Sequence, residues 1–234
     1  MKKTKIAVFD IDGTIFRNNL HFELINELVW MKVFPQYVRD ELIKLYSNWL
    51  EHEGTYESYR NALVKLYDQH IVGKTPEKIK EASQIVVPFY KDRTYIFADG
   101  LIKELRQKNY HIIAISGSPI EIVREFNKLH MGLDQVFGTV YEVDEDGFYT
   151  GREEFAPVKN KGLLLEQYIY ENDLTLKDSY GIGDMESDAS FLEKVEYPIA
   201  FNPNFNLKQI AEEKGWTIKV EKKDVVYDVT CSRD

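Results

Sequence analysis

The stretch VFDIDGTIFRNNL, residues 8–20, places two carboxylates two residues apart directly after an apolar run. Asp10 and Asp12 carry like charges, and acidic residues are poor strand formers, so the chain gains little stability from this pair. Asp is also common as an N-cap or turn residue, which leaves an ordinary strand-to-loop junction as the alternative. The rest of the sequence is needed to tell whether Asp10 and Asp12 have a structural or a chemical role.

The pattern around this stretch predicts an α/β fold. The run KIAVF, residues 5–9, is typical of a short buried strand, whereas residues 20–90 show helical periodicity and no convincing strand. From residue 101 onward, helical and strand patterns alternate, which favours a parallel sheet with helices on both faces. The turn DEDG, residues 144–147, indicates a small β-hairpin within this part.

The alternating part needs the first strand, so we expect it to form one discontinuous domain. The predicted division is a doubly wound, Rossmann-like core over residues 1–16 and 92–234, interrupted by a helical cap domain over residues 17–91.

Composition indicates a globular protein, with 44% hydrophobic and 29% charged residues among 234. The net charge of -9 and the lack of a basic run argue against nucleic acid or anionic lipid as partners. The chain starts without the apolar stretch of a signal peptide, no run is long enough to cross a membrane, and Cys231 is the single cysteine. We therefore expect a cytoplasmic location, no membrane partner, and a monomer or homodimer.

Functional side chains follow three of the predicted strands. Besides Asp10 and Asp12, these are Ser116 in SGSP and Asp184 in GIGDMESD. Ligands of doubly wound sheets gather at the carboxyl ends of the strands, so the convergence is more informative than any one residue. Each has a structural alternative, an N-cap serine or an acidic first helical turn.

The acids Asp184, Glu186 and Asp188 offer the hard oxygen ligands that suit a divalent cation such as Mg²⁺. Lys161 opens a predicted helix, where a lysine is normally unfavourable, so an anionic partner would explain it. A solvated surface lysine is the alternative, and Lys159 is a competitor that spacing does not exclude.

Taken in order, these segments resemble the haloacid dehalogenase superfamily of phosphohydrolases. The family pattern is Asp-x-Asp-x-Thr, a Ser or Thr at a strand end, a Lys, and Gly-Asp-x-x-x-Asp. The matching residues are Asp10, Asp12, Thr14, Ser116, Lys161, Gly183, Asp184 and Asp188. A helical cap between the first two motifs is typical of the phosphoserine-phosphatase-like subfamily, subfamily IB.

The resemblance implies a Mg²⁺-dependent phosphatase that works through an aspartyl-phosphate. Asp10 would be the nucleophile and Asp12 the acid and base. The metal would be bound by Asp10, Asp12 and Asp184, with Asp188 orienting either a metal-bound water or the lysine.

The resemblance also assigns the phosphoryl group to a set of polar residues. It would be held by Thr14, Ser116, Gly117 and Lys161.

The substrate is expected to be a small phosphorylated metabolite. Phosphoserine enzymes carry a Glu nine residues after the nucleophile, and this chain has Asn19 there, with Glu23 one helical turn further on. Those enzymes also use a cap arginine for the substrate carboxylate, for which Arg60 and Arg39 are candidates. The substitution at residue 19 indicates a substrate other than phosphoserine.

Two other functions share this residue set. A phosphotransferase would pass the phosphoryl group to an acceptor other than water, which product analysis with an alcohol present would reveal. A phospho-accepting switch module also combines acids, a Ser or Thr, a Lys and Mg²⁺, but it carries no helical insertion and lacks an acid two residues after the acceptor. Asp12 and the cap therefore argue against the switch module.

Overall fold

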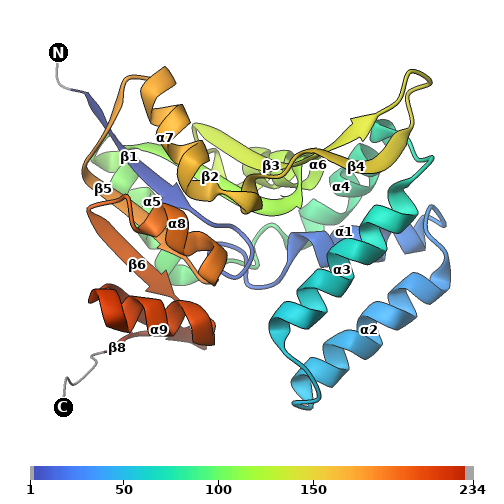
Figure 1. Cartoon of the computed structure of the whole chain (residues 1–234), viewed down its shortest axis with the longest axis horizontal. Helices are drawn as coiled ribbons and strands as arrows, with labels where there is room; N and C mark the ends of the chain where they lie inside the picture. Colours follow the sequence, from blue (N-terminus) through green and yellow to red (C-terminus); the bar gives the residue numbers. More distant parts are fainter. Residues whose placement is uncertain (1–2, 230–234) are drawn as a thin grey trace.

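The computed structural model describes residues 3–229 and has a mostly parallel sheet at its centre (Figure 1). The sheet order is β4-β3-β2-β1-β5-β6-β7-β8. The strands are β1 Thr4–Phe9, β2 His111–Pro119, β3 Gln135–Val143, β4 Tyr149–Phe155, β5 Leu174–Gly183, β6 Tyr197–Phe201, β7 Thr217–Lys222 and β8 Val225–Val229. The expected α/β fold class is confirmed.

The α-helices lie between these strands. They are α1 Leu20–Trp30, α2 Gln36–Leu50, α3 Tyr56–Ile71, α4 Pro76–Tyr90, α5 Ile96–Gln107, α6 Ile120–Phe126, α7 Lys161–Glu171, α8 Ala189–Leu192 and α9 Phe205–Lys214. Helices α1 to α4 follow one another without an intervening strand, between β1 and α5. They form a helical insertion between β1 and α5.

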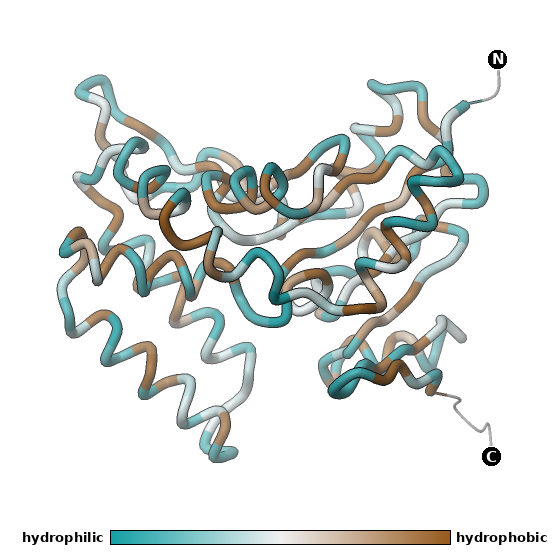
Figure 2. The backbone as a smooth tube through the Cα atoms, turned by 180° about the vertical axis from the view of Figure 1, so that it is seen from behind, coloured by the Kyte–Doolittle hydropathy of each residue, from teal (hydrophilic) through white to brown (hydrophobic). Residues whose placement is uncertain are grey.

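Strand β1 lies in the middle of the sheet and is buried on both faces. Ala7 and Phe9 belong to the hydrophobic cluster that includes side chains of α5 and α6, whereas Ile6 and Val8 belong to the cluster with α7, α8 and α9. Successive side chains of a strand point to opposite faces, so KIAVF serves both layers with one continuous apolar run. Figure 2 shows the hydrophobic segments concentrated along the inner strands, with hydrophilic loops outside.

The helical insertion packs against helices and strands of the core. Helices α1 and α4 contact each other and α6, and α3 contacts β4. The backbone of Tyr149 on β4 also exchanges hydrogen bonds with residues after α3: its N–H donates to the carbonyl of Lys74, and its carbonyl accepts from Gly73. Figure 1 shows the β3–β4 hairpin reaching toward the helical insertion, on the side away from α9. One wall of the space between cap and core therefore comes from this hairpin.

Two elements of the core have irregular or extended ends. Helix α6 is followed by a π-helical turn, Asn127–Met131, that ends at Gly132 in a left-handed conformation. Strand β4 of the hairpin begins at Tyr149 and continues to Phe155. Tertiary pairing with β3 extends β4 through the polar sequence REE, which local propensity does not favour.

The end of the described chain forms β8, which pairs antiparallel with β7 at the sheet edge. Cys231 lies outside the described residues. Among residues 3–229, no helix combines the length and apolar character needed to span a bilayer.

Candidate active site

The strand order brings the predicted functional residues to one edge of the sheet. Strand β1 is hydrogen-bonded to β2 on one side and to β5 on the other, with Phe9 in register with Ala114 and Ile182. Asp10, Ser116 and Asp184 follow these three positions by one or two residues. Because parallel strands end at a common edge, the three side chains converge.

Lys161 joins this group from the first residue of α7. Its Nζ donates to Asp10 Oδ1 and to Asp188 Oδ1, both at 2.6 Å, and its side chain is only 2% exposed. The anionic partners that its place at a helix start suggested are therefore carboxylates. Lys159 is 71% exposed and pairs with Glu153 instead.

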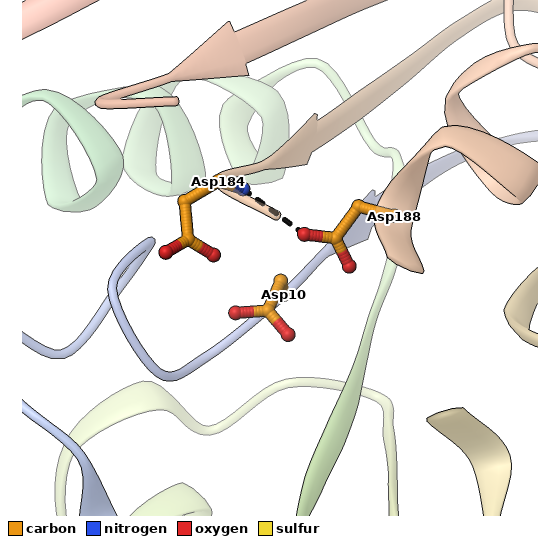
Figure 3. A group of neighbouring side chains, drawn as sticks. All are labelled: Asp10, Asp184 and Asp188. Carbon is orange, nitrogen blue, oxygen red and sulfur yellow. Dashed lines mark hydrogen bonds between the residues drawn. The ribbon is translucent and has the colours of Figure 1, made fainter. Parts of the chain in front are cut away.

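Asp10, Asp184 and Asp188 form a buried carboxylate cluster. One oxygen from each lies within 4.8 Å of the others, and Figure 3 shows Asp184 and Asp188 flanking Asp10. Asp188 uses both oxygens, since Oδ1 accepts from Lys161 and Oδ2 accepts from the backbone N–H groups of Asp184 and Met185 at 3.0 Å. Asp10 Oδ2, in contrast, is buried and has no hydrogen-bond partner among the described residues.

This donor set fits a hard divalent cation. Burial and the neighbouring carboxylates Asp10 and Asp188 raise the pKa of Asp184 well above its ordinary value, and burial raises the pKa of Asp10 to about 7. Burial alone would lower the pKa of Lys161, but Asp10 and Asp188 raise it, so the lysine stays charged. One lysine does not neutralise three buried carboxylates, and a cation on Asp10 Oδ2 and Asp184 would supply the missing charge.

Asp12 lies beside this cluster and is held by three donors. Its Oδ2 accepts from the hydroxyls of Ser116 at 2.8 Å and Ser118 at 2.7 Å, and its Oδ1 accepts from the N–H of Leu20 at 2.6 Å. Burial raises the pKa of Asp12, while these donors oppose the rise. The last contact shows that Asp12 also accepts a hydrogen bond from the first residue of α1, so it contributes to local structure there.

Gly13 and Thr14 bring the β1 loop close to Asp184. Gly13 has a φ of +91°, and a Cβ there would lie 2.1 Å from Asp184 Oδ2, so only glycine fits. The Thr14 hydroxyl donates to Asp184 Oδ1 at 3.4 Å and is fully buried. Thr14 therefore contacts the acidic cluster rather than the open cavity.

A cavity of about 220 Å³ opens in front of Asp10. Of the predicted phosphate and substrate residues, Gly117, Lys161, Asn19 and Arg60 line it. Ser116 lies behind it, bonded to Asp12. Glu23 is buried outside the lining, where it accepts from Asn18 at 2.8 Å.

Several other residues that line the cavity were not predicted from the sequence. Ser118 could have been found, because it lies two residues after Ser116 in the same SGSP segment. His21 lines the cavity two residues after Asn19, and Thr139, Tyr141 and Glu153 contribute the hairpin wall. No local signal marks the hairpin residues, since only tertiary packing places β3 and β4 beside α3.

Comparison with known proteins identifies the family of this chain. Residues 7–193 match the family described as haloacid dehalogenase-like hydrolase. The chain belongs to this family. It is 29% identical over 227 residues to a phosphoserine phosphatase of Methanocaldococcus jannaschii, covering 96% of this chain and 95% of that protein. It is also 24% identical to a histidinol-phosphatase of Neisseria meningitidis serogroup C, covering 91% of this chain and 97% of the relative.

Solved structures of similar proteins show the same fold. A phospho-aspartyl intermediate analogue of phosphoserine phosphatase superposes with a TM-score of 0.64 at 26% identity, covering 95% of this chain and 96% of the other. A Bordetella pertussis protein of unknown function gives a TM-score of 0.72 at 21% identity, covering 93% and 98%. The expected haloacid dehalogenase membership, close to phosphoserine-phosphatase-like members, is confirmed.

Proposed function

We propose that this haloacid dehalogenase-like hydrolase is a Mg²⁺-dependent phosphatase of small phosphomonoesters. The observation that carries the proposal is the environment of Asp10. One oxygen is held by Lys161, while the other is buried and unpartnered among the described residues, and the side chain lines a cavity. A cavity of about 220 Å³ is smaller than typical drug-sized sites of roughly 300–1,000 Å³, which favours a small substrate.

The proposed reaction has two displacements. The Asp10 carboxylate attacks phosphorus, the bond from phosphorus to the ester oxygen breaks, and the leaving oxygen takes a proton from Asp12. Asp12 then takes a proton from water as the water oxygen attacks phosphorus, which releases phosphate and restores the Asp10 carboxylate. Asp12 is suited to both steps, because it lines the same cavity as Asp10.

The remaining residues orient the phosphoryl group and balance its charge. Lys161 holds Asp10 in place and offsets the negative charge, and Gly117, which lines the cavity, would donate its backbone N–H to a phosphoryl oxygen. Ser116 acts through its hydrogen bond to Asp12, and Thr14 through its contact with Asp184. Asp188 positions Lys161, since both of its oxygens are already engaged.

Asp10 and Asp184 would hold Mg²⁺, together with the Asp12 backbone carbonyl. When bound, the cation supplies charge neutralisation for the phosphoryl oxygens and the nucleophile.

Removal of divalent cations tests the metal assignment. Treatment with EDTA is expected to lower phosphate release from p-nitrophenyl phosphate by about 100-fold or more, with recovery on addition of Mg²⁺. Mg²⁺ should also raise the melting temperature, because it binds a folded cluster of like charges. Full activity after exhaustive chelation would remove the metal from the proposal.

A broad panel of phosphorylated metabolites tests the activity itself. Phosphate release should exceed transfer to added alcohols. Failure of the Mg²⁺-loaded protein to release phosphate from both p-nitrophenyl phosphate and the panel would overturn the phosphatase function.

A further inference from the structure

Two neighbouring cavities share Asp184 and Tyr56 as lining residues, but they differ in which of the proposed catalytic residues line them. The cavity of about 220 Å³ includes Asp10, Asp12 and Lys161. The other cavity, of about 430 Å³, borders Gly13 and aromatic side chains of the cap, but its lining excludes Asp12. A leaving oxygen must come within hydrogen-bond reach of its proton donor. The leaving group therefore belongs in the smaller cavity.

Two neutral side chains on α1 and its N-cap have spare hydrogen-bonding capacity on the wall of this cavity. Asn19 is 8% exposed, and its Oδ1 accepts from the N–H of Phe22 at 3.0 Å, so the Nδ2 group is left over. His21 is 2% exposed, and its Nε2 has no hydrogen-bond partner among the described residues. Burial lowers the pKa of His21 to about 3, so the ring is uncharged at neutral pH.

Acidic side chains around the wall are already engaged. Glu153 pairs with Lys159, and Asp68 accepts from the Tyr141 hydroxyl at 2.7 Å. Glu23 lies outside the lining. An ammonium group in this cavity would compete with Lys159 for Glu153 and would be repelled by Arg60, which also lines the cavity, and burying an unpaired charge is costly.

Hydroxyl groups match this wall better. A neutral imidazole has one donor and one acceptor nitrogen, and an amide NH₂ donates, whereas a hydroxyl both donates and accepts. The Thr139 and Tyr141 side chains on the facing hairpin are also uncharged.

We infer that the leaving group is a hydroxyl-bearing group of the sugar or polyol class that carries no ammonium, and that His21 and Asn19 are its specificity-determining residues. This inference rests on the proposed phosphatase function and narrows its substrate class. The inferred substrate class differs from phosphoserine and histidinol phosphate, the amino-bearing compounds after which two relatives are named.

The first test compares kcat/KM of the Mg²⁺-loaded wild type on three groups of substrate. These are hydroxylic esters such as glycerol 3-phosphate and glucose 6-phosphate, ammonium-bearing esters such as phosphoserine and phosphoethanolamine, and p-nitrophenyl phosphate. The best hydroxylic ester is expected to exceed both ammonium esters by about tenfold or more. Preference for an ammonium ester would overturn this inference alone, whereas inactivity on p-nitrophenyl phosphate and on every ester of the panel would overturn the phosphatase function as well.

The second test uses His21→Phe, which keeps a ring against Tyr67 but removes both nitrogens. The rings of His21 and Tyr67 pack edge-on, with their centroids 4.4 Å apart. The ratio of kcat/KM for the best hydroxylic ester to that for p-nitrophenyl phosphate should fall about tenfold, mainly through KM. An unchanged ratio would contradict a specificity role for His21.

Tyr67→Phe is the matched control for packing in this region. It removes a buried hydroxyl that also has no partner among the described residues, yet Tyr67 does not line the cavity. Its substrate ratio should equal that of the wild type. A tenfold fall in this control would show that packing, rather than the imidazole nitrogens, sets the ratio. The wild-type comparison decides the substrate class even if His21→Phe fails to fold.

Discussion

The substitution Asp10→Asn is expected to lower kcat for p-nitrophenyl phosphate by about 10⁴-fold or more, because an amide oxygen does not act as the nucleophile. The side chain keeps its shape, and its amide oxygen can still accept from the Lys161 Nζ that lies 2.6 Å from Asp10 Oδ1. The loss therefore reports on the chemistry of the carboxylate rather than on its packing. Steady-state phosphate release in the presence of Mg²⁺ measures the effect.

Folding of Asp10→Asn serves as the control for this loss. The substitution removes one of three clustered carboxylates, so it relieves repulsion while keeping the buried hydrogen bond. We expect a melting temperature equal to or above that of the wild type. Activity retained within tenfold of the wild type, in protein shown by mass spectrometry to be free of deamidation at this position, would contradict the nucleophile assignment.

The substitution Lys161→Met is expected to destabilise the protein by about 3–5 kcal/mol, the usual effect of removing one partner of a buried ion pair. Lys161 is the shared cation of Asp10 and Asp188, and all three side chains are nearly inaccessible to water. Its removal leaves two buried carboxylates without their donor. The free energy of urea unfolding, measured near neutral pH without divalent cations, tests this expectation.

Lys159→Met is the matched control, since it changes the same residue type two positions earlier. Lys159 is 71% exposed, and its pair with Glu153 is a surface contact, so the expected change in unfolding free energy is within about 0.5 kcal/mol. Adding Asp188→Asn to Lys161→Met should recover part of the lost stability, because one uncompensated charge is removed. Equal stability of Lys161→Met and Lys159→Met would contradict the proposed charge balance.

The fold and most of the candidate site follow from local sequence, because the motifs around Asp10, Ser116 and Asp184 each lie at the end of a strand. The run before Asp10 is apolar on both sides of the strand, which predicts a central position, and β1 indeed lies between β2 and β5. Parallel strands share their carboxyl edge, so the three motifs had to meet there.

The walls of the cavity could not be predicted in the same way. Tyr141 and Glu153 lie on a hairpin whose contact with α3 depends on tertiary packing. Spacing made Glu23 a candidate for substrate contact. Its buried carboxylate instead accepts a hydrogen bond from Asn18, and Glu23 lies outside the cavity lining. Spacing places a residue along a helix, whereas packing decides which surface the residue faces.

The most direct measurement is a rapid acid quench of Asp12→Asn with p-nitrophenyl phosphate and Mg²⁺. p-Nitrophenolate leaves without a proton donor, whereas hydrolysis of the intermediate needs the base at position 12, so the phosphorylated enzyme should accumulate. We predict a burst of about one p-nitrophenolate per active site and an acid-trapped acyl-phosphate on the peptide that contains Asp10. Continued turnover with no burst and no phosphate on that peptide would contradict covalent catalysis by Asp10.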